Sequence, residues 1–288
     1  MKIGIEYGAL INGYEKKWGK EEGRKKFLET GFSCVDFSLA QTEGWTYNSP
    51  EDSAKKALRE IFDDLKKEGI EISQIHGPWR YPPKDYTEAD RCERLEKMKR
   101  SIRMCGHMGC KRWVIHPIMP FGTEDVGTGN EEKTWEMNKT FMSELLKTAK
   151  EENVLICFEN MPFPNLSLAS PESILKFVEE MDDDSFRICL DTGHANIFPE
   201  ISLGDVVRHM GDKLEALHVH DNDEKDDRHW IPSIGTIDWE DFGKALTEID
   251  FKGVFSYETE ISEAVPVGAY ELMNKALVLF AKEILGEK

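Results

Sequence analysis

The 288-residue sequence lacks several features that would place it in a class at once. No apolar run reaches the roughly 18 residues needed to span a bilayer. The opening MKIGIEYGAL has no apolar core of the signal-peptide type and is typical of a first strand. The six cysteines contain no CxxC pair, which disfavours a zinc ribbon or a small disulfide scaffold. We therefore expect a cytoplasmic protein with reduced thiols and no membrane partner.

Basic residues are also scarce. The chain has 37 lysines and arginines against 55 aspartates and glutamates, a formal net charge of −18. Proteins that bind nucleic acids normally carry a basic face, because phosphate contacts supply most of their non-specific affinity. We therefore expect no nucleic-acid partner, and the charge chiefly favours solubility.

Eight short β-rich runs alternate with helical patterns along the chain. Strands are expected at 2–8, 34–39, 72–77, 112–117, 154–160, 187–193, 214–221 and 253–259. Helices are expected near 20–30, 51–68, 88–107, 131–151, 171–180, 203–210, 239–248 and 266–285. Ser49-Pro50 and Ser170-Pro171 are typical helix starts, and Gly31 and Gly69 are typical helix ends.

Eight strand–helix units predict an α/β fold with a parallel sheet, and eight is the number that closes a (β/α)8 TIM barrel. The rival is a doubly wound open sheet. It usually has a glycine-rich phosphate loop after its first strand, and Tyr7-Gly8-Ala9-Leu10 is not such a loop. With no linker or repeat in sight, we predict one barrel domain over residues 1–288.

Imidazoles and carboxylates recur at the ends of the third to eighth predicted strands. They are His76, His116, Glu159, Asp191, His194, His218, His220, Asp227, His229 and Glu258. In a barrel these strand ends converge on the face where active sites lie. So many polar groups in one volume would repel each other or be costly to desolvate without a cation. The pattern predicts a divalent metal site, and mixed nitrogen and oxygen ligands favour Zn, Mn, Fe or Co over Ca.

Strand alternation gives an independent check on this prediction. The positions two residues before the candidate ligands should share their face, and all are small: Cys157, Cys189, Ala216 and Ser256. The positions between are large and should face the helices: Phe158, Leu190, Leu217 and Tyr257. Taken singly, the candidates have simpler interpretations: His76 as a core histidine, Asp191 as a helix cap, Asp227 as a solvated loop charge.

The motifs at these strand ends resemble those of the xylose-isomerase-like TIM barrels, a superfamily of sugar isomerases and epimerases that also contains endonuclease-IV-type DNA repair enzymes. The matching segments are Phe158-Glu159-Asn160, Leu190-Asp191-Thr192-Gly193-His194, His218-Val219-His220-Asp221 with Asp227-Arg228-His229, and Tyr257-Glu258-Thr259. The resemblance covers nearly the whole chain. It implies a metal-dependent enzyme that acts on a small sugar or sugar phosphate, and it leaves a homodimer open.

The resemblance to the sugar epimerases also implies roles for individual residues. One metal would be held by Glu159, Asp191, His218 and Glu258, with His220 as the alternative third ligand. The two glutamates would flank the sugar carbon, one abstracting a proton and the other returning it, and His194 would contact substrate oxygens.

The endonuclease-IV-type members bind three zinc ions through nine ligands, and this chain matches all nine positions. His76, His116, His194, Asp227 and His229 are therefore candidates for further ions, giving one to three ions of Zn, Mn, Mg or Co in all. Against DNA repair stand the acidic charge and the strand-end loops, which offer aromatic side chains in place of clustered lysines: Trp45, Trp79, Tyr81, Phe121, Phe163 and Trp230. Among these, Trp45 and Trp79 are the predicted sugar-binding residues.

We therefore expect an isomerase or epimerase of a small sugar, sugar phosphate or keto-polyol, with glutamate proton transfer through an enediolate. The alternatives are a metal-dependent phosphodiesterase on abasic DNA, an inositol-type dehydratase, or a non-catalytic sugar-binding barrel. The candidates nearest to a phosphate site are Lys225, Arg228 and Lys252. The glycine-containing loop from Pro117 to Asn130 is predicted to be a mobile lid over the pocket.

Overall fold

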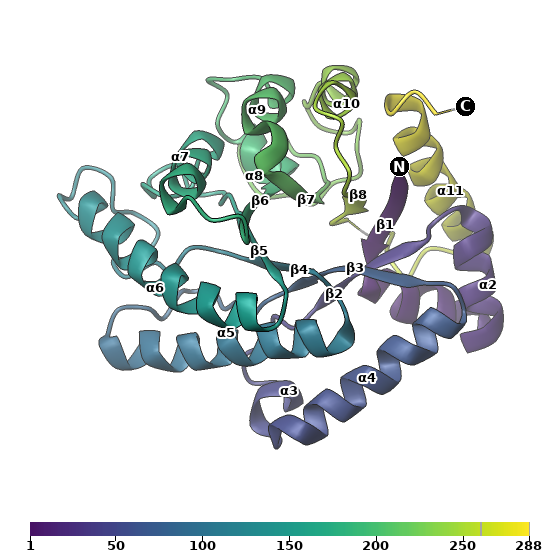
Figure 1. Cartoon of the computed structure of the whole chain (residues 1–288). Coiled ribbons are helices and arrows are strands. Elements are labelled where there is room, and N and C mark those ends of the chain that lie inside the picture. Colours follow the sequence, from purple (N-terminus) through teal and green to yellow (C-terminus); the bar gives the residue numbers. More distant parts are fainter. Residues whose placement is uncertain (260, 288) are drawn as a thin grey trace.

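The computed structural model describes residues 1–259 and 261–287 and shows eight parallel strands that curve into a barrel (Figure 1). The strands are β1 Lys2–Glu6, β2 Cys34–Ser38, β3 Glu71–His76, β4 Arg112–Ile115, β5 Leu155–Glu159, β6 Phe186–Asp191, β7 Leu214–His218 and β8 Val254–Tyr257. Their order is β7-β6-β5-β4-β3-β2-β1-β8, so sequence neighbours are also spatial neighbours. The predicted parallel TIM barrel is confirmed.

The barrel closes between its last two strands at one point. Residue Val219, just beyond β7, forms a parallel bridge with Tyr257 at the end of β8. Two backbone hydrogen bonds make this bridge, from the Val219 N–H to the Ser256 carbonyl (2.8 Å) and from the Glu258 N–H to the Val219 carbonyl (3.1 Å). Closure therefore takes place at the C-terminal ends of the strands, where the candidate site residues lie.

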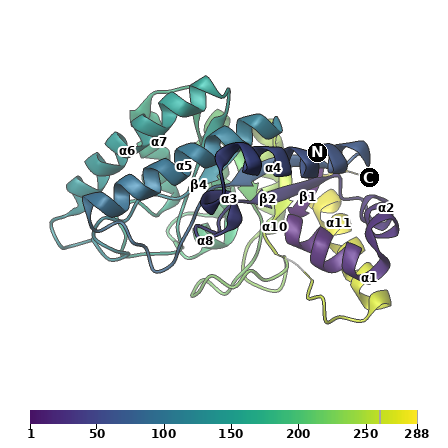
Figure 2. The same ribbon diagram turned by 90° about the horizontal axis from the view of Figure 1, so that it is seen from below.

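Helices surround the barrel, as Figures 1 and 2 show from two directions. The eight longer ones are α2 Lys20–Thr30, α4 Glu51–Lys67, α5 Glu88–Met108, α6 Glu131–Glu151, α7 Pro171–Met181, α9 Leu203–Met210, α10 Trp239–Glu248 and α11 Val267–Ile284. All eight correspond to predicted helices. Five short helical segments were not predicted: η1 Ala9–Glu15, α1 Lys16–Trp18, α3 Trp45–Asn48, α8 Thr192–Asn196 and η2 Gly211–Lys213.

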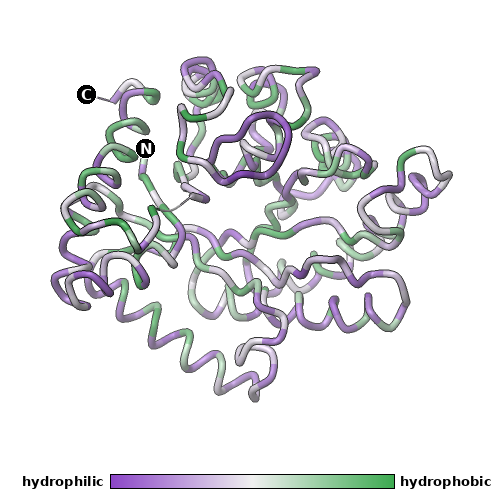
Figure 3. Tube along the Cα trace, turned by 180° about the vertical axis from the view of Figure 1, so that it is seen from behind, coloured by the Kyte–Doolittle hydropathy of each residue, from purple (hydrophilic) through white to green (hydrophobic). Residues whose placement is uncertain are grey.

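Local sequence explains most helix ends. The Ser170 side chain caps α7 by accepting from the Ser173 N–H at 3.2 Å, and Gly31 ends α2 with a φ of 113°. Ser49-Pro50 precedes α4 as expected, since the helix begins at Glu51, although no side chain caps it there. Helix α4 alternates hydrophilic and hydrophobic segments along its length, as an amphipathic helix does (Figure 3).

Strand alternation works as predicted around the lumen. Cys157, Cys189 and Ala216 are fully buried and form a small apolar cluster with Val114. On the other face of β5, Phe158 packs against Phe177 of α7 with ring centroids 5.1 Å apart. The Tyr257 hydroxyl likewise points to the helix layer, donating to the Leu277 carbonyl in α11 at 2.7 Å. Small side chains therefore fill the middle of the barrel and leave the upper layer free for larger polar groups.

None of the helices in the described part of the chain is long and apolar enough to cross a membrane. All six cysteines are free thiols, as expected.

The small lumen layer predicts that a larger side chain will be costly there. We expect Ala216→Leu to destabilise the protein by about 1–3 kcal/mol, because Ala216 is fully buried and its surroundings are closely packed. Ala276→Leu, on the exposed face of α11, should change stability by less than about 0.5 kcal/mol. Urea unfolding followed by circular dichroism compares the two, and equal stabilities would contradict the packed lumen layer.

Candidate metal centre

Four side chains meet at the C-terminal end of the barrel lumen. Glu159, Asp191 and His218 are the last residues of β5, β6 and β7, and Glu258 directly follows β8. Each offers a nitrogen or oxygen atom that lies within 4.8 Å of those of the other three. These are the four residues that the resemblance implied as ligands of one metal ion, and the structure brings them together.

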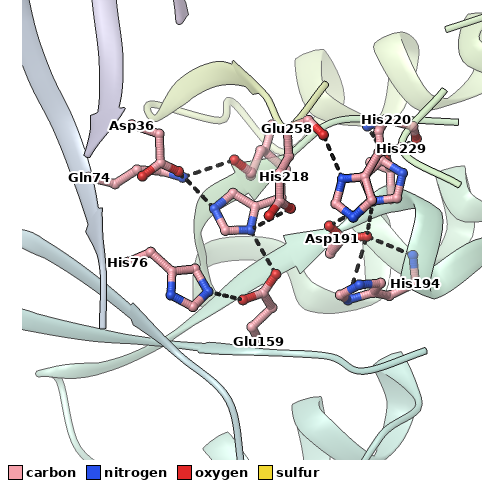
Figure 4. Close-up of polar contacts among 12 residues, drawn as sticks. Asp36, Gln74, His76, Glu159, Asp191, His194, His218, His220, His229 and Glu258 are labelled. Atoms are coloured by element: carbon pink, nitrogen blue, oxygen red, sulfur yellow. Dashed lines mark hydrogen bonds and ion pairs between the residues drawn. The ribbon is translucent and has the colours of Figure 1, made fainter. Parts of the chain in front are cut away.

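The His218 imidazole occupies the centre of this group (Figure 4). Its Nδ1 lies 2.7 Å from Glu159 Oε1 and 3.1 Å from Glu258 Oε2. Its Nε2 faces the opposite direction and lies 2.8 Å from Asp36 Oδ2. The ring therefore presents Nδ1 to the candidate ligands.

A second group of imidazoles surrounds the other oxygen of Glu159. His116 Nε2 lies 2.9 Å and His76 Nε2 3.5 Å from Glu159 Oε2. The two Nε2 atoms are 3.3 Å apart. These histidines end β3 and follow β4, so Glu159 connects them with the central group.

A third group lies on the far side of Asp191. His194 Nε2 and His229 Nε2 lie 3.3 Å and 3.2 Å from the same oxygen of Asp227. The Asp191 carboxylate also accepts from the His194 backbone N–H at 2.6 Å, so it caps the short helix α8. The interpretation of Asp191 as a cap and its interpretation as a candidate ligand are therefore compatible.

Asp221 shapes the loop that carries Asp227 and His229. Its carboxylate accepts hydrogen bonds from the backbone N–H groups of Ser233 (2.9 Å) and Gly235 (3.1 Å) and from the Trp239 indole (3.0 Å). At Gly235 a Cβ atom would lie 2.0 Å from a backbone oxygen, so only glycine permits this approach. The buried carboxylate thus folds the loop back over the barrel.

A cavity of about 510 Å³ opens above these groups. Its lining includes Glu6, Asp36, His76, His116, His194, His218, Asp227, His229 and Glu258 together with Tyr7, Trp79, Tyr81 and Phe163. Trp79 packs edge-on against His116 with centroids 4.4 Å apart, and Tyr81 stacks on Phe163. No lysine or arginine occurs among the described residues that line it.

Two of the predicted substrate contacts lie elsewhere. Trp45 begins α3, is 51% exposed and does not line the cavity. His220 is fully buried, with Nε2 3.0 Å from Asp191. A Cβ at Gly193 would lie 1.9 Å from the His220 ring, so glycine lets this ring reach Asp191. Neither residue lines the cavity: Trp45 lies at the surface, whereas His220 contacts Asp191 and belongs to two groups of side chains that could hold a metal ion.

Other loop residues named in the sequence analysis also lie away from the cavity. Phe121 and Trp230 do not line the cavity. Lys252 precedes β8 and pairs with Asp250 at the opposite end of the barrel. The loop from Pro117 to Asn130 is anchored, because the fully buried Asp125 accepts hydrogen bonds from the Ser167 backbone N–H (2.7 Å) and hydroxyl (2.8 Å). These contacts hold the loop at Asp125, and its expected mobility stays a prediction.

Two further carboxylates line the cavity and were not among the predicted site residues: Glu6 at the end of β1 and Asp36 in the middle of β2. A strand-end rule applied to the first strand points to Glu6. No such rule reaches Asp36, because it is the third of the five residues of β2.

The donor set fits a divalent cation. Two carboxylate oxygens, Glu159 Oε2 and Glu258 Oε2, are buried without a hydrogen-bond partner, although imidazole nitrogens lie close to both. Burying such an oxygen atom costs folding free energy unless a positive charge or a hydrogen-bond donor lies beside it. Two carboxylates from Glu, one from Asp and one imidazole nitrogen form a ligand set that suits Zn, Mn or Co.

Without a cation, the histidines compensate the carboxylates. Burial opposes protonation of His218, but the nearby Glu258 and Glu159 carboxylates outweigh it and hold the pKa of His218 well above its usual value. Burial likewise opposes protonation of His194, while Asp191 and Asp227 raise its pKa to about 10. Burial of Glu159 is outweighed by His218 and His116, which hold its pKa well below the usual range.

These shifts predict that metal binding releases protons. The raised pKa of His218 favours a proton on its imidazole in the metal-free protein, and an imidazole must lose the proton from the nitrogen that ligates. Below the raised pKa of His218, metal affinity should therefore rise by about tenfold per pH unit for each proton displaced. Calorimetric Zn²⁺ titrations in two buffers of different ionisation enthalpy measure this release, and an identical heat in both buffers would contradict it.

The chain belongs to the xylose isomerase-like TIM barrel family, whose model matches residues 25–277. A D-psicose 3-epimerase of Enterocloster bolteae is 25% identical over 281 residues, which cover 92% of this chain and 86% of that protein. The family expected from the strand-end motifs is thereby confirmed.

Two solved structures show the same fold over nearly their whole length. A D-tagatose 3-epimerase-like protein aligns with a TM-score of 0.74 at 24% identity, covering 99% of this chain and 98% of that one. The IOLI protein with a binding zinc atom aligns with a TM-score of 0.71 at 17% identity, covering 99% and 96%. At these identities the likeness concerns the fold.

Proposed function

We propose that this xylose isomerase-like barrel is a metal-dependent epimerase of small, uncharged sugars. The observation that carries the proposal is the position of Glu159 and Glu258, which both contact His218 Nδ1 from the floor of the cavity. The D-psicose 3-epimerase with 25% identity supports the reaction class. The zinc atom bound by the IOLI protein supports a metal in a barrel of this fold.

In this proposal Glu159, Asp191, His218 and Glu258 hold the cation. The bound cation supplies Lewis-acid polarisation of the substrate carbonyl, which acidifies the neighbouring C–H group. Epimerisation then needs a proton removed from one face of that carbon and a proton delivered to the other. We assign these two roles to Glu159 and Glu258, which both approach His218 Nδ1, one accepting and one donating.

The remaining lining gives the sugar its position. His194 borders the cavity and directs Nε2 towards Asp227, where either side chain can hydrogen-bond a hydroxyl group. Trp79, Tyr81 and Phe163 supply the apolar wall that sugar rings stack against. His76, His116, Asp227 and His229 all border this cavity, either as substrate contacts or as ligands of a further ion.

Charge argues against a phosphorylated substrate. The described lining has carboxylates but no lysine or arginine. The nearby Arg228 is occupied by Asp226 (2.6 Å) and Asp223 (3.4 Å). A phosphate would therefore meet acidic groups with no lysine or arginine partner, which disfavours its binding.

The competing function is a phosphodiesterase on abasic DNA. It is favoured by one observation, the convergence of all nine matching side chains around Glu159 and Asp191 in three adjoining groups. The acidic cavity and the net charge of −18 oppose it, because a DNA enzyme must neutralise several phosphates along a groove.

The proposal predicts metal-dependent exchange of a substrate C–H proton. With Mn²⁺ or Co²⁺ present, free ketoses incubated in D₂O should gain deuterium at the epimerised carbon, and the corresponding ketose phosphates should react far more slowly. Glu159→Gln and Glu258→Gln should each lower kcat by at least about 10²-fold, because each removes an acid–base group. Nuclear magnetic resonance follows the exchange.

Glu215→Gln provides the matched control, since Glu215 pairs with Arg112 at the other end of the barrel. Its kcat should equal that of the wild type. Wild-type exchange rates in both glutamate variants would contradict the proposed proton transfer, and loss of water without exchange would indicate a dehydratase.

The charge argument predicts a negative result with DNA. A duplex containing one abasic site should remain uncut at physiological salt after incubation with Zn²⁺-loaded protein, because the acidic mouth repels the phosphate backbone. Gel electrophoresis resolves the cleaved strand. Efficient cleavage would overturn the sugar assignment in favour of the phosphodiesterase.

A further inference from the structure

We propose that Asp36 is a positioning residue that fixes the orientation and tautomer of the metal ligand His218. This inference rests on the proposed function, because it takes His218 to bind the cation. Asp36 belongs to β2 and lies outside every group of potential metal ligands found among the described residues. Its role follows from the contact it makes with the far side of the imidazole ring.

The two nitrogens of His218 meet different environments. Nε2 lies 2.8 Å from Asp36 Oδ2, whereas Nδ1 lies 2.7 Å from Glu159 Oε1 within the ligand group. The ring is 1% exposed, so water does not replace either contact. Figure 4 shows Asp36 on one side of the imidazole and the glutamates on the other.

This arrangement determines which nitrogen can bind a cation. A neutral imidazole has one N–H group, and an ionised carboxylate only accepts hydrogen bonds. The proton of the ligating form therefore resides on Nε2, where it donates to Asp36. Nδ1 is left with a free lone pair directed at Glu159 and Glu258.

Asp36 is itself held in place by Gln74 of β3. The Gln74 side-chain amide donates to Asp36 Oδ2 at 2.8 Å and to the Leu217 carbonyl at 3.1 Å. Leu217 immediately precedes His218, so Gln74 joins the carboxylate to the backbone that carries the imidazole. Strands β2 and β3 are not neighbours of β7 in the sheet, and the link therefore crosses the lumen.

Because Asp36 lies across the lumen, it can restrain the orientation of the His218 ring, which the backbone of β7 cannot do. The backbone of β7 fixes where His218 begins, but the ring can still turn about its side-chain bonds. A carboxylate on the opposite wall removes that freedom. Histidines that bind metals commonly donate their second N–H to such a partner, and loss of the partner typically weakens metal binding by about 10–100-fold.

The test compares Zn²⁺ affinity in full-length variants by competition with a chromophoric chelator at pH 7.5. Asp36→Ala removes the acceptor and should weaken Zn²⁺ binding by about 10–100-fold. Asp36→Asn keeps the size and one acceptor oxygen, so its loss should be smaller. Asp125→Asn is the matched control: Asp125 is equally buried and hydrogen-bonded but contacts no candidate ligand, and its Zn²⁺ affinity should match the wild type.

A second readout is insensitive to general destabilisation. Long-range ¹H–¹⁵N correlation spectra of the Zn²⁺-loaded protein report which His218 nitrogen carries the proton. The wild type should show it on Nε2 with a sharp signal, and Asp36→Ala should show a shifted or broadened Nε2–H signal, because the ring has lost its hydrogen-bond acceptor. An unchanged spectrum, or Zn²⁺ affinity within twofold of the wild type in Asp36→Ala, would overturn the inference while leaving the proposed function intact. A wild type that binds no Zn²⁺ or Mn²⁺ would overturn both.

Discussion

The charge of Glu159 is the constraint on which the rest of the site depends. Burying a charged carboxylate that is only 1% exposed costs much free energy unless positive charges or hydrogen-bond donors lie beside it. Here three imidazoles do so, with His218, His116 and His76 at 2.7, 2.9 and 3.5 Å from its oxygens. In the metal-free protein, nearby carboxylates raise the pKa of His218 and of His76 and favour protons there, whereas burial lowers the pKa of His116 to about 4. A cation would offset the cost by displacing these protons, so metal binding and pH response have one physical origin.

Only a closed barrel can bring those imidazoles to one carboxylate. His76 and His116 come from the third and fourth strands and His218 from the seventh, on the other side of Glu159. The small side chains of the middle lumen layer keep the barrel filled below them. Closure at the Val219–Tyr257 bridge then sets the residue that follows, Glu258, beside His218. The same closure that stabilises the fold therefore completes the candidate ligand set.

The fold and the floor of the site were accessible from sequence because both follow from local periodicity. Eight strand–helix alternations define the barrel, and the last position of each strand must point towards the same end. The errors occur where that regularity stops. His220 lies two residues beyond the end of β7, where strict alternation no longer applies. The exposure of Trp45 and the anchoring of the 117–130 loop depend on contacts such as that of Asp125, which no spacing rule encodes. Asp36 acts across the lumen on a residue 182 positions away, and only the folded chain shows that pairing.

In the proposed epimerase, chemistry and substrate choice would depend on different parts of the molecule. The nine imidazoles and carboxylates at the barrel floor suit either a sugar epimerase or a phosphodiesterase, so they do not decide between the two. Discrimination between a sugar and a phosphodiester would depend on the entrance of the cavity, in the loop whose conformation Asp221 fixes. That loop carries Asp223, Asp226 and Asp227 and engages its own Arg228 in ion pairs. In the proposed epimerase this acidic segment, whose Asp227 lines the cavity, would oppose the approach of a polyanion but not that of an uncharged sugar. The element that brings Asp227 and His229 to the site would therefore also select against phosphates.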